Sequence, residues 1–434
     1  MTMTAGHSRR RFLGSSGLLL AGLGVPGLTS CGGGSGSGGQ VSLRMFWSGS
    51  QETNRILLSV IKAFEKANSK IDIRPEYGAG GGAADKLNTQ IAGGRAPDLI
   101  VMSTSSMSDY VKRKVIFPLD EYTSSVIDLS DFDKRVVANA TIDGKLYALP
   151  LGVNAPGLIY NRTVFERAGV DVPPPEWTWD DFAHTANVLT TAVGDGVAGS
   201  EDAGGKKAPF ELFIRQRGKE LFDGPQLGFT KEDLGDWLDF WYQLRRTGGV
   251  VAPDVQALYD QMANSPLIKG KAPMLFAAAD NILGAQPLIK DKLDLHLYPR
   301  GEGDAPLGFY LVSNTMFVGY ARTERKQETA TAIGAMLTKP EIAKFNMVEH
   351  GMPPSSKARD LVAAELDADA KHVFDFIQNF ATMAGDPPAP APPGGSEVED
   401  ILDRTNTDVA FRRLDIPAAV DRFFSEASSA LKSD

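Results

Sequence analysis

The first third of the chain predicts an α/β fold with a largely parallel sheet. Three short segments, 41–47, 71–77 and 99–102, have the residue types of β-strands and end at glycine, serine or proline. Between the first two, apolar residues recur at helical spacing: Ile56, Leu57, Val60, Ile61 and Phe64. A strand, helix, strand, helix, strand order is typical of a layered α/β domain.

The boundaries of these elements carry their own signals. Ser48 or Ser50 can cap the first helix, because a serine hydroxyl accepts a hydrogen bond from a free amide of the first turn. A glycine loop at 78–82 precedes a second helix that contains Leu87 and Ile91, and a turn at 93–98 precedes the third strand.

Ligands bind beyond the carboxyl ends of the strands in such sheets. That rule indicates the polar segments 47–51, 78–82 and 103–106. We expect five residues there to face a ligand: Trp47, Ser48, Gln51, Ser103 and Ser105. Trp47 has an alternative role as a core residue at the sheet edge, and the sequence leaves the two roles open. Trp177 and Trp179, at a helix start, and Trp237 and Trp241, four apart on a helix, are expected to be structural.

Composition excludes several classes of function. The formal net charge is −9 and no basic cluster follows the first residues, so nucleic acid is not an expected partner. The single cysteine excludes disulfide bonds within the chain and cysteine-ligated zinc. The scattered histidines are not spaced as metal ligands. The sequence Gly78–Ala83 matches the glycine pattern of a dinucleotide-binding motif, but the preceding strand is polar and contains Pro75, unlike the buried strand that such a motif follows. We therefore expect no metal and no cofactor.

The N-terminal segment predicts export. Three arginines at 9–11 precede an apolar stretch that is too short to span a membrane, and a Leu-Thr-Ser-Cys sequence ends at Cys31. The paired arginines resemble a twin-arginine signal, and the segment 28–31 resembles a bacterial lipobox. Residues 1–30 are predicted to be a signal peptide, and residues 31–40 a lipidated cysteine followed by a flexible Gly/Ser tether. The protein is then expected on the outer face of the cytoplasmic membrane.

Several blocks of the chain resemble the extracellular solute-binding proteins of carbohydrate ABC importers, the maltose-binding-protein-like family 1. Segment 94–100 is similar to the "G-x-x-P-D-hydrophobic" block of that family, and segment 143–150 reads Asp-Gly-Lys-Leu-Tyr-Ala-Leu-Pro, matching its "DGKLYALP" block. Segments 158–170 and 174–182 match its "YN…F…AG" and "PP…TWDDF" blocks. Segments 270–274 and 351–355 lie where the family has "GKAAM" and "GxP" elements.

The resemblance implies an α/β, two-lobe periplasmic-binding-protein-like (type II) fold with a hinge and a ligand cleft between the lobes. Residues 41–152 and 310–350 are expected to form lobe 1, and residues 153–309 and 351–434 lobe 2. The hinge crossings are expected near 150–154, 308–314 and 350–354.

Further ligand-facing residues are expected in lobe 2 and at the crossings. The family pattern suggests Asn154, with a turn asparagine as the alternative, together with Phe210 and Glu211 at a helix start. Asp280 and Asn281 follow an apolar run, where they can bind hydroxyls or cap a helix. The second crossing suggests three more residues: Gly308, Phe309 and Tyr310.

These features predict a lipid-anchored binding protein, not an enzyme, that captures a mono- or oligosaccharide and delivers it to membrane permease subunits of an ABC importer. We expect it to act as a monomer. The alternatives are a binding protein for a non-sugar solute, such as glycerol phosphate or a peptide, and a secreted glycoside hydrolase. A hydrolase needs a pair of carboxylates in space, which counting residues does not exclude.

Overall fold

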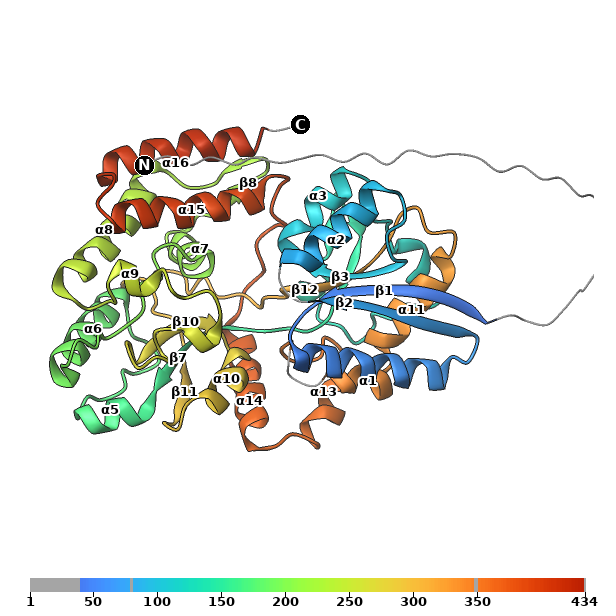
Figure 1. Ribbon diagram of the computed structural model, residues 1–434, viewed down its shortest axis with the longest axis horizontal. Helices are drawn as coiled ribbons and strands as arrows, with labels where there is room; N and C mark the ends of the chain where they lie inside the picture. The colour runs from blue at the N-terminus through green and yellow to red at the C-terminus, as the bar shows by residue number, and fades with distance from the viewer. Residues whose placement is uncertain (1–39, 79–80, 347–349, 433–434) are drawn as a thin grey trace, which may run out of the picture. The chain divides into compact units, whose positions relative to one another are not determined.

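A five-stranded sheet forms the centre of the first hydrophobic core, called core 1 below (Figure 1). The computed structural model describes residues 40–78, 81–346 and 350–432. The strand order is β2-β1-β3-β12-β6, and β1 pairs in parallel with both β2 and β3, whereas β12 runs antiparallel to β3 and β6. The strands are β1 (Val41–Ser48), β2 (Ile71–Gly78), β3 (Leu99–Ser103), β6 (Ala148–Pro150) and β12 (Thr315–Gly319).

Helices cover both faces of this sheet. Figure 1 shows α1 (Gln51–Ala67) and α11 (Lys326–Thr338) on one side, and α2 (Gly81–Ala92) and α3 (Met107–Lys112) on the other. The helix α1 begins where one of the two expected caps lies, since Ser50 Oγ accepts a 3.0 Å hydrogen bond from the Thr53 amide. Because both faces are covered, side chains on either side of β1 are buried, and Trp47 is one of them.

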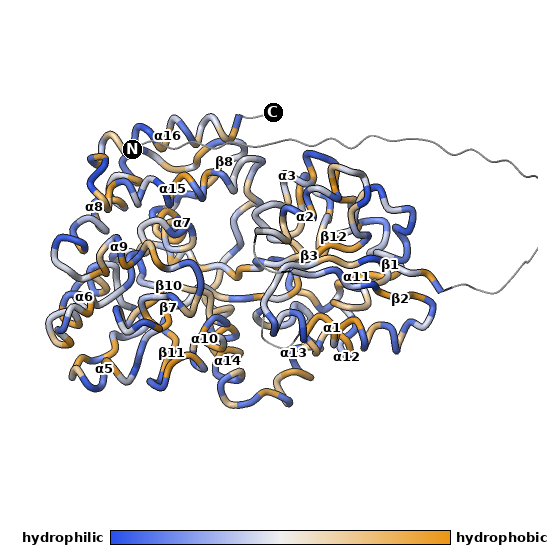
Figure 2. The backbone as a smooth tube through the Cα atoms, in the orientation of Figure 1, coloured by the Kyte–Doolittle hydropathy of each residue, from blue (hydrophilic) through white to orange (hydrophobic). Residues whose placement is uncertain are grey.

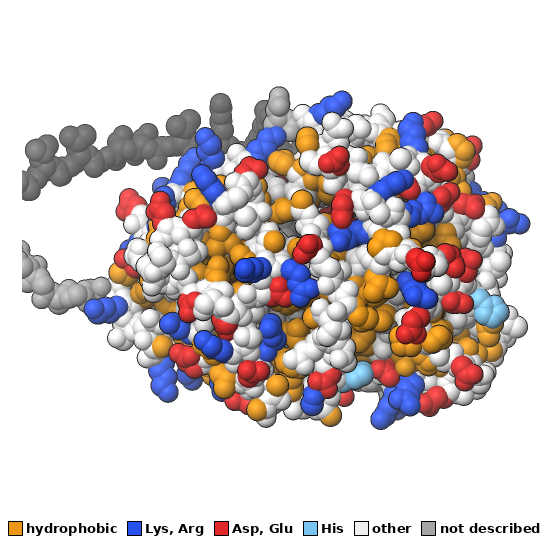
Figure 3. Space-filling model, turned by 180° about the vertical axis from the view of Figure 1, so that it is seen from behind, with side chains coloured by type: hydrophobic (Ala, Val, Ile, Leu, Met, Phe, Trp, Pro, Cys, Tyr) orange, Lys and Arg blue, Asp and Glu red, His pale blue; other side chains and the backbone are white. Residues whose placement is uncertain are grey.

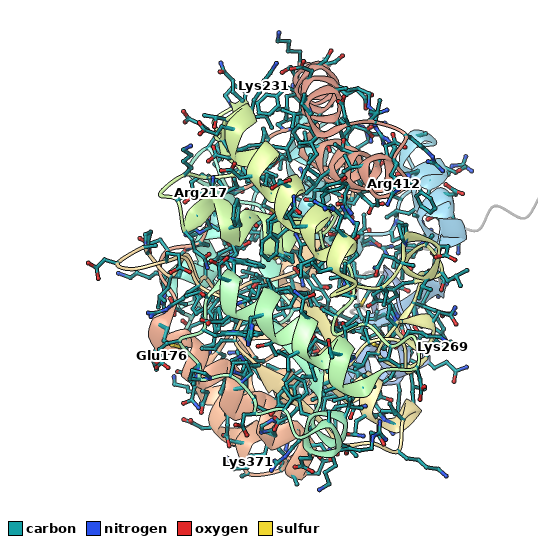
Figure 4. All side chains as sticks on the ribbon, turned by 90° about the vertical axis from the view of Figure 1, so that its left-hand side faces the viewer. Glu176, Arg217, Lys231, Lys269, Lys371 and Arg412 are labelled. Carbon is teal, nitrogen blue, oxygen red and sulfur yellow. The ribbon has the colours of Figure 1, made fainter. Side chains whose placement is uncertain are left out.

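A second hydrophobic core, core 2, surrounds a three-stranded antiparallel sheet of order β10-β7-β11. Its strands are β7 (Pro156–Asn161), β10 (Met274–Ala278) and β11 (Leu293–His296). The longer helices around it are α6 (Trp179–Val193), α8 (Lys231–Thr247), α14 (Ala368–Met383), α15 (Gly395–Ala410) and α16 (Ile416–Ala430). The shorter ones are α5 (Arg162–Ala168), α7 (Lys207–Arg215), α9 (Pro253–Gln256) and α10 (Asn281–Ala285). Figure 4 shows α8 beside α15 and α16, with Lys231 and Arg412 at their ends.

The remaining elements are short. They are α4 (Lys134–Ala138), α12 (Pro340–Ala343), α13 (Ser356–Ala363) and two hairpins, β4–β5 (Thr141–Ile142 with Lys145–Leu146) and β8–β9 (Phe222–Asp223 with Gln226–Leu227). None of the helices in the described ranges is both long enough and apolar enough to cross a membrane.

Four tryptophans lie in core 2, where they have the structural role expected of them. Trp237 and Trp241 are fully buried on α8, and Trp237 donates a 2.7 Å hydrogen bond from Nε1 to the Gly204 carbonyl. Trp179 packs edge-on against Trp237, and Trp177 lies edge-on to Phe182. The capping box of α6 aims Trp179 inward, because Thr178 and Asp181 bond each other's amides. Figure 2 shows hydrophobic stretches of the tube near β7, the central strand of the core 2 sheet.

The chain passes between the two cores at hydrogen-bonded segments. Leu151 belongs to core 1 and Val153 to core 2, and Val153 exchanges two 2.7 Å backbone hydrogen bonds with Met352. Asn154 pairs with Val312 in the same way, at 2.8 and 2.9 Å. The backbone is closely packed here: a Cβ on Gly351 would lie 2.2 Å from the Val153 carbonyl oxygen, and its φ of +86° also favours glycine.

The predicted α/β fold is thus confirmed. The signal peptide, Cys31 and most of the Gly/Ser tether lie outside the described residues, as does part of the 78–82 loop. The lobe boundaries given above stay a prediction.

Candidate functional site

Two neighbouring cavities share one face of α15. The small cavity has a volume of about 280 Å³ and includes Glu399, whereas the large cavity, about 610 Å³, includes Asp403, Asn406 and Ala410. These positions are three or four residues apart, so they lie along one stripe of the helix. The start of α7 also joins the cavities, because Lys206 lines the large one and Lys207 the small one.

The small cavity contains four of the expected site residues: Ser103, Ser105, Glu211 and Tyr310. It draws on both cores, since Ser103 ends β3 of the five-stranded sheet, whereas Glu211 lies on α7. The loop between α14 and α15 closes one side with Pro388–Ala391, and the Ala391 carbonyl accepts a 2.5 Å hydrogen bond from Ser108 of α3. Other lining residues are Thr104, Asn139, Lys207, Ala208, Phe222, Val312, Ser313, Asn314 and Glu399.

A partly buried hydrogen-bonded group forms the core 2 wall of the small cavity. The Tyr310 hydroxyl donates to Glu211 Oε2, and the Arg215 guanidinium lies 5.0 Å from the centre of the Tyr310 ring. Burial raises the pKa of Tyr310 well above its usual value, and the nearby Glu211 carboxylate adds to the rise. The Tyr310 hydroxyl therefore stays protonated and donates, which holds the Glu211 carboxylate in place.

A salt bridge joins two residues that line the small cavity. Lys207 Nζ lies 2.7 Å from Glu399 Oε1, and both side chains are about one-third exposed. Burial lowers the pKa of Lys207, but the carboxylates of Glu211 and Glu399 outweigh burial and leave the pKa raised. Lys207 is therefore charged at neutral pH and is matched by these carboxylates.

The large cavity is lined mainly by polar side chains. Asn281, an expected site residue, stands at the start of α10 on one side of it. The other lining residues are Asp202, Gly205, Lys206, Pro253, Gln256, Ala257, Tyr259, Asp260, Gln261, Met262, Asp403, Asn406, Thr407, Ala410 and Phe411. Amides, carboxylates and one aromatic hydroxyl thus face the same space, and these groups suit a ligand with many hydroxyls.

Two ion pairs fix the wall of the large cavity. Arg245 binds Asp202 through two hydrogen bonds of 2.5 and 2.9 Å, and it also donates to Asn406 Oδ1 at 2.5 Å. Lys206 Nζ lies 2.7 Å from Oε1 of the fully buried Glu201 and 4.9 Å from the centre of the Tyr259 ring. The orientations of Asp202, Asn406 and Tyr259 are therefore set before any ligand arrives.

Trp47 does not face either cavity. Its side chain is fully buried, its Nε1 donates a 2.8 Å hydrogen bond to Asn54 Oδ1, and its ring stacks on Tyr77 at a centroid distance of 4.9 Å. Tyr77, which is 47% exposed, covers the ring face that a sugar would need. The structure therefore gives Trp47 the alternative role, that of a core residue at the sheet edge. Both faces of β1 are covered, which accounts for the burial.

Two expected aromatic residues are also core residues. Phe210 is fully buried and packs against Phe229 and Trp237 at 5.1 and 5.7 Å between ring centroids. Phe309 is 4% exposed and packs on Phe380 at 5.0 Å. Each adjoins a cavity-lining residue in the sequence, Glu211 and Tyr310. Neighbouring side chains point in different directions, so one lines the cavity and the other packs inward.

The remaining expected residues line neither cavity. Asn154 is buried and caps its own backbone, since its Oδ1 accepts a 2.9 Å hydrogen bond from the Ala155 amide. The Gly308 carbonyl accepts from Arg215 Nε at 2.9 Å, and Asp280 Oδ1 accepts from Asn281 Nδ2 at 3.2 Å. Ser48 and Gln51 are exposed at the carboxyl end of β1.

The sequence interpretation missed most residues of the large cavity. Lys206, Tyr259, Asp403 and Asn406 belong to no motif, and they meet only because α7, the segment after α9, and α15 converge. One signal was present: Glu399, Asp403 and Asn406 form a polar stripe on α15 beside buried Ile401, Leu402 and Val409.

The described residues contain no group of three or more His, Cys, Asp or Glu side chains arranged to hold a metal ion. The groups that line the cavities are hydrogen-bond donors and acceptors, aromatic rings and carboxylates. Such an arrangement can bind and orient a polar ligand.

Known proteins resemble the chain over most of its length. It is 24% identical over 424 residues to a protein named as a binding protein in Brucella abortus (strain 2308), a match that covers 95% of this chain and 98% of the relative. It is 29% identical over 167 residues to the arabinooligosaccharide-binding protein of Halalkalibacterium halodurans, which covers 35% of this chain and 34% of that protein.

A solved structure agrees with the fold. The family 1 extracellular solute-binding protein of Alicyclobacillus acidocaldarius superposes with a TM-score of 0.70 and 26% identity, covering 92% of this chain and all of that chain. The sequence profile described as bacterial extracellular solute-binding protein matches residues 48–344, more than half of the chain. The fold, the paired polar cavities and this match agree: the chain belongs to the bacterial extracellular solute-binding protein family.

Proposed function

We propose that the protein captures a mono- or oligosaccharide in the two cavities along α15 and delivers it to the permease of an ABC importer. The observation that carries the proposal is the small cavity, where Ser103 and Ser105 beside core 1 face Glu211 and Tyr310 beside core 2. A ligand that bonds both walls favours the state in which the walls are close, because it gains free energy only from that differential contact. The printed name of the Halalkalibacterium halodurans relative supports a saccharide.

We further propose that the two cores are lobes that hinge about the paired segments between them. The backbone pairs Val153–Met352 and Asn154–Val312 hold these segments together, so rotation there can leave both cores intact. The boundaries predicted from the sequence, 41–152 with 310–350 and 153–309 with 351–434, place these pairs at the hinge. The binding role is also consistent with a surface on which both signs of charge are interspersed (Figure 3), rather than a basic surface for nucleic acid.

A thermal-shift screen of the protein against neutral mono- and oligosaccharides tests the binding function. A ligand that binds only the native state stabilises it by RT ln(1 + [L]/Kd), about 2.7 kcal/mol at a hundredfold excess over Kd. At least one saccharide is expected to raise the melting temperature and to be recovered unchanged after incubation. Cleavage of the bound saccharide would instead support the hydrolase alternative. If no saccharide raises the melting temperature but a glycerol phosphate or a peptide does, the result would support a non-sugar solute.

We propose that Cys31 carries a lipid that anchors the protein to the outer face of the membrane. Two or more acyl chains suffice for stable attachment, since each buried methylene contributes about 0.8 kcal/mol. Mass spectrometry of the mature N-terminus is expected to find a lipid on Cys31, and Cys31→Ala is expected to move the protein from the membrane fraction to the soluble fraction. An unmodified Cys31 in protein recovered from membranes would contradict the anchor.

A further inference from the structure

A third cavity lies where α8 and α15 end, and the charged residues that line it are all basic. It has a volume of about 310 Å³, and its charged lining residues within the described ranges are Arg245, Arg246 and Arg412. Figure 4 shows Arg412 at the end of α15, beside α8. The third cavity adjoins the large cavity, because Pro253 and Ala410 line both, but the three arginines do not line the large cavity. It is therefore a separate space with its own positive charge.

Arg245 has an unused hydrogen-bond donor in the wall of this cavity. Its side chain is 9% exposed, and its Nε and Nη2 bond Asp202 and Asn406, which fixes the plane of the guanidinium. Its Nη1 is buried and donates no hydrogen bond within the described ranges. A buried N–H without a partner costs free energy, and a ligand oxygen that accepts from it would recover that loss. The third cavity thus has a fixed and unsatisfied donor on one of its lining residues.

The other two arginines are exposed, and neither forms a salt bridge in the part of the chain that the structure describes. Arg246 donates a 3.2 Å hydrogen bond to a neutral glutamine side chain. Arg412 lies just beyond α15. The carboxylate of Asp408, one turn earlier, is paired with Arg413 and Arg422 instead. The positive charges of Arg246 and Arg412 are therefore not neutralised by a carboxylate.

The ends of the two helices do not cancel this charge. The free carbonyl groups at the C-terminus of a helix act as about half a negative elementary charge, so α8 and α15 together supply about one. Arg246 and Arg412 supply two positive charges, whereas Arg245 and Asp202 neutralise each other. The cavity keeps about one positive charge by this estimate, which favours an anionic ligand.

The other walls of the third cavity are largely apolar. Val250 and Val251 are each 4% exposed, and Tyr242 contributes an aromatic side chain. These walls suit a ligand that has a small apolar body attached to its anionic group. Among anionic groups, a phosphate monoester matches arginine best, because its oxygens accept paired hydrogen bonds from the planar guanidinium.

We propose that the third cavity binds a phosphate monoester, for which Arg246 and Arg412 supply the charge and Arg245 Nη1 a fixed donor. The phosphoryl group can belong to a soluble ester or to a lipid headgroup, since both have the same chemistry. The site is distinct from the two cavities of the proposed function and does not depend on a saccharide.

Calorimetric titration with phenyl phosphate and benzoate at low ionic strength tests the inference. The two probes share an aromatic ring, but phenyl phosphate has about 1.5 to 2 negative charges at neutral pH, whereas benzoate has a single charge. Phenyl phosphate is expected to bind at one site per chain and at least about fivefold more tightly than benzoate. Arg246→Gln and Arg412→Gln are each expected to weaken the binding of phenyl phosphate at least about fivefold. Both arginines are exposed, so both variants are expected to keep the melting temperature of the parent.

Arg167→Gln is the matched control. Arg167 is exposed in the last turn of α5, forms no salt bridge within the described residues and lines none of the three cavities. The control removes the same charge and is expected to leave the affinity for phenyl phosphate unchanged. A failure of phenyl phosphate to bind, equal affinity for benzoate, or equal losses in Arg167→Gln and Arg412→Gln would overturn the inference.

Flotation with phosphatidylcholine vesicles, with and without phosphatidic acid, distinguishes the two sources of the phosphoryl group. The experiment uses the full chain with Cys31→Ala, so that the proposed lipid anchor does not itself bring the protein to the vesicles. Flotation that requires phosphatidic acid and is lost in Arg412→Gln would identify a lipid headgroup. Binding of phenyl phosphate without flotation would identify a soluble phosphate ester.

Discussion

Trp47→Ala is expected to lower the free energy of unfolding by about 3–5 kcal/mol and to leave ligand affinity unchanged. The Trp47 side chain is fully buried under the stacked ring of Tyr77, so its removal leaves a cavity between the sheet and its covering helices. It also leaves Asn54 Oδ1 without the 2.8 Å hydrogen bond from the indole. Chemical denaturation measures the first effect, and calorimetric titration with a saccharide from the screen measures the second.

Tyr77→Ala is the matched control for this prediction. The Tyr77 ring stacks on the same indole but is 47% exposed, so its loss is expected to cost less stability than the loss of Trp47. A Trp47→Ala variant that keeps the parent stability and loses affinity tenfold or more would show that Trp47 faces the ligand. Trp47 would then not be a core residue.

Arg245→Met is expected to destabilise the protein by about 3–5 kcal/mol, because it leaves the buried Asp202 carboxylate without its cation. The side chains of Arg245 and Asp202 are 9% and 2% exposed, and two hydrogen bonds join them. The double variant Arg245→Met with Asp202→Asn is expected to regain part of this loss. Asparagine removes the buried charge and keeps an oxygen for the 3.0 Å hydrogen bond from the Gly204 amide.

Lys231→Met provides the comparison with an exposed pair. Lys231 lies 2.6 Å from Asp421, but the two side chains are 58% and 70% exposed, and such pairs contribute about 0–1 kcal/mol. Urea denaturation of the three variants and the parent measures these differences. If the double variant is less stable than Arg245→Met alone, the uncompensated charge on Asp202 is not the cause of the loss.

Much of the fold follows from local features of the sequence. Apolar residues at helical spacing predict the buried face of α1. Ser50 and Thr178 cap their helices, because each side chain accepts a hydrogen bond from the amide three residues later. Each of these signals needs only neighbours in the chain. The class of the fold could therefore be predicted from the sequence, and the family from the blocks that resemble it.

The site was less predictable because it depends on which elements meet. The expected residues Ser103, Ser105, Glu211, Tyr310 and Asn281 line the two cavities, whereas Trp47, Phe210 and Phe309 are buried in the cores. A strand that is covered on both faces buries residues at successive positions, so alternation along β1 does not reveal the role of Trp47. Asp403 and Tyr259 are far apart in sequence, and only the packing of α15 brings them together.

Small-angle X-ray scattering with and without a saccharide that binds is the most direct test of the central claim. That claim is that ligand bonds both walls of the small cavity and draws the two cores together about the paired segments. We predict that the radius of gyration falls on saturation with the saccharide and returns to its starting value when the saccharide is removed. Saturating binding with an unchanged scattering curve would contradict the claim.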